Sequence, residues 1–484
     1  MAMASIKRNF IFDLLNNITG LLFPLMTFPY ISRILNPEGI GEVAFAQSII
    51  SYFVMVAALG IPTYALREVA KLKNDHDKLS SFTFEIFTIH AILSVIAYLV
   101  ALSFVLIGRI NEIWITYVIA STHIILNFLG FSWFFQGVEE FRFIAIRVLI
   151  FRILSLIALF LFVRESTDVY WYVTILVVSE AGNNICNVFK LRKYVSFKKV
   201  RIKWTNLRKH INPIVSLFLL SVSTMIYFNM DNLMIGFIKD DVSVGYYNPA
   251  LRIQRLLMGF VLSLSTVLFP RLSSLASTDK KTFFSLGRQG ITVTLGLSIP
   301  ISFGLYALGE PLILLFAGEQ FTPSILTLYF LAPVIILGTC SNLFAKILIS
   351  QEKENMVLIA TSVGAIVNLL LNALLIYYFA QYGAAVASSI SELSVLITMI
   401  IVGHCYLPKS LFSKDVFKYL LASVVMFASI FFLYRILLIN DVLTKCLIVF
   451  VSGTCVYGLS LIMLKESIFV PKLKMIVFSK WMNR

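Results

Sequence analysis

The chain has 484 residues, of which 59% are hydrophobic and only 13% are charged, whereas soluble domains carry about 25% charged residues. Apolar runs of about twenty residues recur along its whole length, which excludes a soluble globular protein and predicts helices that span a membrane. A membrane β-barrel is excluded as well, because runs such as 89–107 are continuously apolar instead of alternating.

We expect an all-α integral membrane protein with about fourteen transmembrane helices. Lys7 and Arg8 before the first apolar run imitate a signal peptide. The run contains Asp13 and continues to Ile31, which favours a retained first span. In chain order the predicted spans are 10–34, 42–70, 82–107, 113–136, 142–164, 169–190, 211–238, 244–271, 284–308, 323–350, 355–380, 384–407, 415–438 and 442–464.

The orientation follows from the charge of the loops. Net charge is +15, and the loop Lys190–Lys209 alone contains nine lysines and arginines with no acid. Basic loops remain in the cytoplasm, so the charge favours this topology over a nucleic-acid partner. Counting six spans back and eight spans forward from this loop predicts that both termini are cytoplasmic, next to Lys7 at one end and Arg484 at the other.

The chain also contains an internal duplication. A shift of 204 positions superimposes three matching pairs of residues, which are Gly41 and Gly245, Arg67 and Arg271, and Asp75 and Asp279. A Ser-Glu pair recurs as well, with Glu180 in the sixth span and Glu392 in the twelfth. These repeats predict two six-helix lobes, related by a pseudo-two-fold axis along the membrane normal, plus two C-terminal helices. The predicted parts are an N-lobe 1–195, a basic cytoplasmic linker 196–210, a C-lobe 211–408, and 409–484 with the last two spans and a cytoplasmic tail.

No motif predicts catalysis, so we do not expect an enzyme. The sequence lacks the GxxxxGK[ST] loop that holds nucleotide phosphates, the HExxH zinc motif and paired cysteines with metal-ligand spacing. We therefore expect no cofactor and no metal site.

Ionisable residues inside the spans are the candidate functional residues, because each costs about 3 kcal/mol at the bilayer centre and seldom faces lipid. The basic candidates for an anion-binding cavity are Arg152, Arg147, Arg252, Arg255, Arg33, Arg67, Arg271 and Lys346. The last four lie near span ends, where snorkelling to headgroups is the alternative. The acidic candidates are Asp231, Glu180, Glu392 and Asp13, which either carry a coupling ion or form structural ion pairs.

Two pairs of segments resemble a known family. Arg33–Ser48 (RILNPEGIGEVAFAQS) with Leu59–Ala70 (LGIPTYALREVA), and Tyr227–Gly236 (YFNMDNLMIG) with Val244–Ile253 (VGYYNPALRI), are similar to the Wzx-type polysaccharide flippases. These belong to the multidrug/oligosaccharidyl-lipid/polysaccharide exporter superfamily. The resemblance runs over essentially the whole chain.

The resemblance implies a protein of the bacterial inner membrane that works by alternating access. It would move undecaprenyl-diphosphate-linked oligosaccharide repeat units from the cytoplasmic to the periplasmic leaflet. Because the sequence lacks a nucleotide-binding loop, uphill transport would need ion coupling. Its partners would be membrane lipid, a polysaccharide polymerase and glycosyltransferases. The alternatives are a peptidoglycan lipid-precursor flippase, a drug/cation antiporter of the same fold, and a membrane scaffold that transports nothing.

Overall fold

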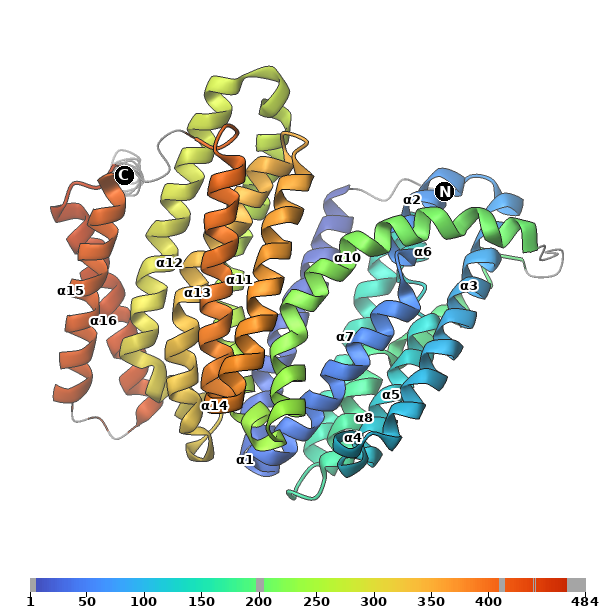
Figure 1. The fold of residues 1–484 in the computed structure, drawn as a ribbon, viewed down its shortest axis with the longest axis horizontal. Coiled ribbons are helices and arrows are strands. Elements are labelled where there is room, and N and C mark those ends of the chain that lie inside the picture. The colour runs from blue at the N-terminus through green and yellow to red at the C-terminus, as the bar shows by residue number, and fades with distance from the viewer. Residues whose placement is uncertain (1–5, 197–203, 409–413, 438, 440, 468–484) are drawn as a thin grey trace, which may run out of the picture. The chain divides into compact units, whose positions relative to one another are not determined.

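The computed structural model describes residues 6–196, 204–408, 414–437, 439 and 441–467. These residues form helices joined by short turns and contain no strand, so the predicted all-α class is confirmed. The chain divides into two compact units, Met1–Gly245 and Tyr246–Arg484, each of which is a bundle of helices (Figure 1).

The first unit begins with a long bent helix and ends with a long helix that crosses the ends of its neighbours. Its elements are α1 (Ile6–Ala58), α2 (Ile61–Leu72), α3 (His76–Ser103), η1 (Phe104–Leu106), α4 (Gly108–Glu112), α5 (Trp114–Phe128), α6 (Ser132–Gly137), α7 (Phe141–Phe162), α8 (Val169–Glu180), η2 (Gly182–Asn184), α9 (Ile185–Leu191) and α10 (Trp204–Ile238). The start of α10 passes over the ends of α2 and α3 before the helix turns along α1 (Figure 1).

The second unit consists mainly of long helices. Its elements are α11 (Asp241–Thr278), which begins just before the boundary, α12 (Lys280–Phe316), η4 (Glu319–Phe321), α13 (Pro323–Ile349), α14 (Glu354–Gly403), α15 (Lys414–Ile436) and α16 (Val442–Met463). The α15–α16 pair packs on α12. The division into lobes at residues 196–210 stays a prediction; residues 197–203 and the tail from 468 lie outside the described residues.

Within the described residues, ten helical segments are long and apolar enough to cross a membrane. Two of them, Leu22–Leu72 and Glu354–Gly403, have 51 and 50 residues, more than twice the length that one crossing needs. Each contains a break, at Asn36 (φ 59°) and at Ala380 (φ 49°), and so corresponds to two predicted spans. The predicted sixth and seventh spans correspond to α8–α9 and α10. The segments therefore accord with about fourteen crossings.

The break in α1 follows from its local sequence. Asparagine tolerates a positive φ better than other residues with a Cβ, and Asn36 adopts it. Pro37 then starts the next helical stretch, where its missing N–H costs nothing. A break can also fall inside a single predicted span. The span predicted at 113–136 consists of two helices, α5, which ends at Phe128, and α6. These interruptions free backbone groups inside the bundle, which neighbouring side chains satisfy.

The predicted offset of 204 is visible in the local structure. A Cβ on Gly41 would lie 1.6 Å from the Asp241 carbonyl oxygen, and a Cβ on Gly245 would lie 1.9 Å from that of Pro37. Pro37 and Asp241 are themselves 204 residues apart, so two equivalent segments cross each other reciprocally with their backbones in contact. Only glycine permits so close an approach at positions 41 and 245.

The helix starts after each copy are equivalent too. Asp75 caps α3 by accepting a hydrogen bond from the Lys78 backbone N–H (3.1 Å), and Asp279 caps α12 by accepting one from that of Thr282 (3.1 Å). The Lys78 side chain and backbone hold the pKa of Asp75 below its ordinary value, and the Thr282 side chain and backbone do the same for Asp279. The two caps satisfy N–H groups that a helix start leaves without partners.

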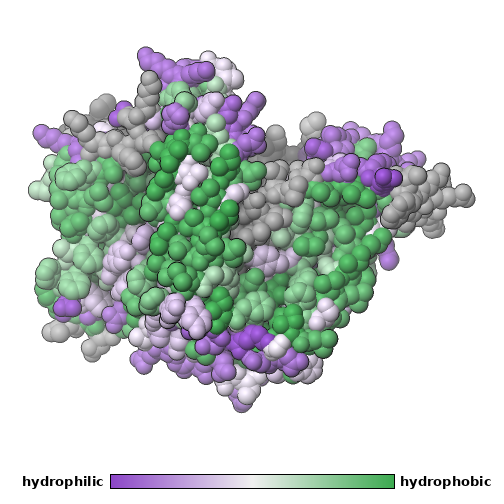
Figure 2. Space-filling model, viewed as in Figure 1, coloured by the Kyte–Doolittle hydropathy of each residue, from purple (hydrophilic) through white to green (hydrophobic). Residues whose placement is uncertain are grey.

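The outer surface is that of a membrane protein. Helix α7 exposes Ile150 (49%), Ile153 (48%) and Ile157 (50%) on one side and buries Arg147 and Leu159 on another. On the face shown in Figure 2, hydrophobic side chains cover the flanks of the helices, while hydrophilic ones collect near the helix ends. Such extended apolar surface is stable in lipid and not in water.

Candidate functional site

Arg152 lies in the middle of α7, so at 1.5 Å of rise per residue it is roughly 15 Å from either end of the helix. Its Nη1 donates to the Asn16 carbonyl oxygen (3.0 Å) and to Thr19 Oγ1 (2.5 Å) on α1. A Cβ on Gly20 would lie 3.4 Å from Arg152 Nη2, so this glycine leaves room for the guanidinium. None of the ion pairs between described side chains includes Arg152.

Glu180 lies near Arg152, at the end of α8. Its side chain is 55% exposed, and its Oε2 is 3.7 Å from Nδ1 of His123 on α5. The carboxylate also interacts electrostatically with the Arg152 guanidinium. The structure thus brings two predicted site residues together and adds His123, in a cluster that is partly accessible and built from α1, α5, α7 and α8.

Arg147 is separate from this cluster, because it points into the helix bundle and is only 4% exposed. Its Nη2 donates to Ser132 Oγ (3.1 Å), and its guanidinium carbon lies 5.5 Å from the centre of the Phe143 ring. Nε and Nη1 are buried without a hydrogen-bond partner among the described residues. A buried guanidinium with two nitrogens lacking hydrogen-bond partners lowers the stability of the fold, which points to a role other than stability.

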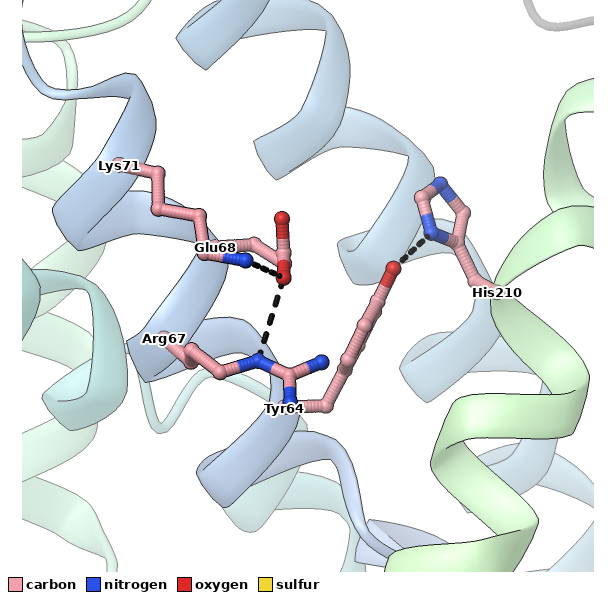
Figure 3. A network of polar contacts seen from close by, with 5 residues as sticks. All are labelled: Tyr64, Arg67, Glu68, Lys71 and His210. Carbon is pink, nitrogen blue, oxygen red and sulfur yellow. Dashed lines mark hydrogen bonds and ion pairs between the residues drawn. The ribbon is translucent and has the colours of Figure 1, made fainter.

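The two remaining basic candidates of the first unit are exposed. Arg33 is exposed and donates to the Pro29 carbonyl oxygen of its own helix. Arg67 is exposed on α2, with its Nε 3.2 Å from Glu68 Oε1, and Lys71 binds the same oxygen at 2.9 Å (Figure 3). Neither is buried in the bundle.

The second unit contains the other basic candidates. Arg252 is partly buried on α11, whereas Arg255 and Arg271 are exposed. Lys346 on α13 donates to Ser265 Oγ (3.2 Å) and Thr266 Oγ1 (2.9 Å) of α11, so it ties these two helices together.

The acidic candidates differ in burial. Asp231 on α10 is buried, at 9% exposed, and interacts electrostatically with Tyr52 of α1. Glu392 on α14 is buried at 6%, and a Cβ on Gly338 would lie 3.3 Å from its Oε1. The glycine therefore makes room for a carboxylate inside the second unit. The side chain of Asp13 lies outside the described residues.

A further polar network was not predicted from the sequence. His210 of α10 joins Glu85 of α3 to Tyr64 of α2, and all three side chains are buried. Figure 3 shows the Tyr64–His210 contact beside the Arg67, Glu68 and Lys71 side chains. As an acid inside a predicted span, Glu85 could have been singled out from the sequence. Its partner His210 could not, because it is 125 residues away in the chain.

Two family models match the chain. The model described as polysaccharide biosynthesis protein matches residues 6–276, and the MatE model matches residues 216–374. The chain is 24% identical over 406 residues to a candidate O-antigen transporter of Escherichia coli (strain K12), covering 82% of this chain and 96% of that protein. It is 28% identical over 172 residues to a candidate low-salt glycan biosynthesis flippase, Agl15, of Haloferax volcanii, covering 35% and 36% of the two chains.

Two solved structures share the fold. The lipid II flippase MurJ in an inward closed conformation superimposes with a TM-score of 0.76 at 18% identity, covering 94% of this chain and 99% of that one. A multidrug resistance MATE family transporter of the MOP superfamily, in an inward-facing conformation, superimposes with a TM-score of 0.65 at 12% identity, covering 81% and 94%. The chain therefore has the fold of a multi-pass membrane transporter.

Proposed function

Because the chain belongs to the polysaccharide biosynthesis protein family, we propose that it is a flippase for lipid-linked oligosaccharides. Its substrate would be an undecaprenyl-diphosphate-linked repeat unit of a surface polysaccharide, moved from the cytoplasmic to the periplasmic leaflet of a bacterial inner membrane. The relatives described as an O-antigen transporter and a glycan biosynthesis flippase support this substrate class. The polymerase and the glycosyltransferases of that polysaccharide would be its partners.

The observation that carries the proposal is the state of Arg152. Its guanidinium is held in mid-helix by a carbonyl and a hydroxyl, both uncharged. A diphosphate would replace these neutral acceptors with charged oxygens, and hydrogen bonds to charged groups are roughly twice as strong. Both of these hydrogen bonds come from Nη1, and a diphosphate would add the bidentate contact that a planar guanidinium favours.

Glu180 gives this site a way to release its ligand. The carboxylate and the substrate's diphosphate are both negative and both attracted to Arg152, so they compete for it. A proton or cation bound to Glu180 would remove the competition and favour the diphosphate. We propose this exchange as one form of ion coupling, with Asp231 and Glu392 as the other candidate carriers.

The remaining cationic candidates would have secondary roles. Arg147 is sealed inside the bundle in this conformation, and it would reach an anion only after the packing around Ser132 and Phe143 opens. Arg252 and Arg255 of α11 are the candidate cations of the second unit. The least specific candidates are those that are exposed or bind neighbouring hydroxyls, which are Arg33, Arg67, Arg271 and Lys346.

Arg152 variants test the proposal in cells whose surface polysaccharide depends on this chain. We expect Arg152→Ala to lower polysaccharide output per molecule of protein about ten- to a hundredfold, from the loss of a charged hydrogen-bonding partner. Arg152→Lys keeps the charge without the planar fork and should retain part of the output. Arg164→Ala is the matched control, because Arg164 is exposed in the turn after α7.

Unchanged output from Arg152→Ala at equal protein level would refute the role of Arg152. The identity of the substrate is tested separately by loss of the chain. A flippase for repeat units should then leave lipid-linked oligosaccharide in the cytoplasmic leaflet. Arrested growth with accumulated peptidoglycan precursor, or sensitivity to cationic drugs alone, would instead identify one of the two alternative transporters.

A further inference from the structure

Three buried side chains from three different helices are connected in a row at one end of the first unit. Glu85 Oε2 on α3 is 2.9 Å from His210 Nε2 on α10, and His210 Nδ1 is 2.8 Å from the Tyr64 hydroxyl on α2. Loop charges predict this end to be cytoplasmic. We name these three residues, Tyr64, Glu85 and His210, the α2–α3–α10 network.

The network is shielded from water except at one point. The side chains of His210 and Glu85 are 4% and 6% exposed, and the Phe82 ring lies edge-on to the imidazole with centroids 5.4 Å apart. Lys209 Nζ is 3.3 Å from the same Glu85 oxygen, and its side chain is 57% exposed. The network therefore has a buried end at Tyr64 and an end that reaches the surface at Lys209.

The hydrogen bonds fit two charge states of His210 with the same heavy-atom positions. An ionised Glu85 only accepts, so Nε2 carries a hydrogen in both states. In the neutral imidazole, Nδ1 accepts a hydrogen bond from the Tyr64 hydroxyl. In the imidazolium, Nδ1 donates to the Tyr64 oxygen instead. A proton is thus bound by reversing one hydrogen bond, and histidine is the side chain that changes charge most readily near neutral pH.

The charged groups around the imidazole determine the relative free energies of neutral and protonated His210. Glu85 of α3 lies against it, with Lys209 and Asn206 of α10 as further partners of the carboxylate. From α2, Tyr64 contacts the ring, and Arg67 and Glu68 follow on the next turn (Figure 3). With the proton bound, a buried carboxylate is neutralised by a buried imidazolium. Without it, the carboxylate depends on Lys209, which is largely in water.

The helix that contributes His210 has a weak point just beyond it. Pro213 lies inside α10 and has no N–H, so the Lys209 carbonyl lacks its partner in the helix ladder. The helix is therefore weakened at the junction between its first turns and the remainder, which continues to Ile238 and contains Asp231. The α2–α3–α10 network joins these first turns to α2 and α3, beside the buried side chains of Leu207 and Ile214.

We propose that Tyr64, Glu85 and His210 form a proton-binding site that makes the docking of the start of α10 depend on pH. This site goes beyond the flippase proposal, because it requires no substrate and is distinct from Arg152 and Glu180. Its ligand is a proton taken from the side of the membrane that Lys209 faces. Its effect is on the helix that leads to Asp231.

Hydrogen exchange of the purified full-length protein in lipid nanodiscs, without substrate, tests the site. We expect the amides in 206–212 to be more protected at pH 6, where the proton is bound, than at pH 8. After correction for the intrinsic pH dependence of exchange, the difference should be up to about tenfold per pH unit. In His210→Gln this dependence should vanish, because glutamine can donate to Glu85 and accept from Tyr64 but does not titrate. His404→Gln, which removes an exposed histidine of the second unit, should behave as the original protein.

Two results would overturn the proposal. One is protection in 206–212 that does not vary with pH in the original protein, and the other is an unaltered dependence in His210→Gln. If His210→Gln does not fold, nitrogen NMR of labelled histidine in the original protein decides the question. A His210 signal that keeps one charge state from pH 5 to pH 8 excludes proton binding there. Because no readout involves oligosaccharide, these outcomes do not depend on whether the flippase proposal is right.

Discussion

Replacing Gly41 by alanine is the most direct test of the crossing between the two repeated segments. The added methyl group would lie 1.6 Å from the Asp241 carbonyl oxygen, whereas ordinary contact begins at 3.4 Å. The backbones must therefore part by about 1.8 Å. Neither side of the contact can yield by rotating a side chain, because the atom that blocks the methyl group is backbone.

The cost should be at the upper end of that for overpacked sites, about 3 kcal/mol. Parting the segments would also separate Gly236 from Phe45. These two residues are packed so closely that a Cβ on Gly236 would lie 2.1 Å from the Phe45 ring. In a unit of this size, 1 kcal/mol corresponds to roughly 2–4 °C in the unfolding midpoint, so we expect Gly41→Ala to lower it by about 6–12 °C.

The assay is thermal unfolding of the purified protein in detergent, with Gly259→Ala as the matched control. Gly259 lies inside α11 and a Cβ there meets nothing within 4 Å, so that substitution should be neutral or stabilise the helix by up to about 1 kcal/mol. Gly245→Ala, with its Cβ 1.9 Å from the Pro37 oxygen, should behave like Gly41→Ala. Midpoints of Gly41→Ala and Gly259→Ala within 2 °C of each other would refute the crossing.

Three further predictions follow from charges. Cysteines at positions 198 and 480, in segments outside the described residues, should not react with an impermeant thiol reagent added to intact cells, and strong labelling of either would contradict the predicted topology. Arg147→Met should leave thermal stability unchanged or raise it by about 1–4 kcal/mol while lowering polysaccharide output, because a buried, poorly paired guanidinium destabilises the fold; a large loss of stability would indicate a structural role. Asp231→Asn should lower output at unchanged protein level if Asp231 carries the coupling ion, and normal output that still requires an ion gradient would exclude that role.

Much of the fold could be predicted from the sequence, because the signals are local. Apolar runs of about twenty residues mark each crossing, Asn36-Pro37 marks the break in α1, and the offset of 204 residues predicted equivalent sites for Gly41 and Gly245. The breaks within single predicted spans, such as that between α5 and α6, were not predicted, because an apolar stretch has the same composition whether its helix is continuous or interrupted.

The candidate site could be predicted only in part. The cost of a charge in the bilayer singled out Arg147 and Arg152 alike. They are five residues apart, so their side chains leave the α7 axis about 140° apart, and the neighbouring helices decide what each one meets. Tertiary packing buries Arg147 in contact with Ser132, whereas it places Arg152 against α1 and near Glu180.

The sequence by itself determined which segments are apolar enough to cross a membrane and which charges lie inside them, since hydrophobicity is a property of neighbouring residues. The tertiary structure alone decided which charges meet. Tyr64 and His210 are 146 residues apart, and Glu85 and His210 are 125 apart. Hydrogen bonds over such separations form only because packed helices bring the side chains within 3 Å, and no periodicity in the chain encodes that distance.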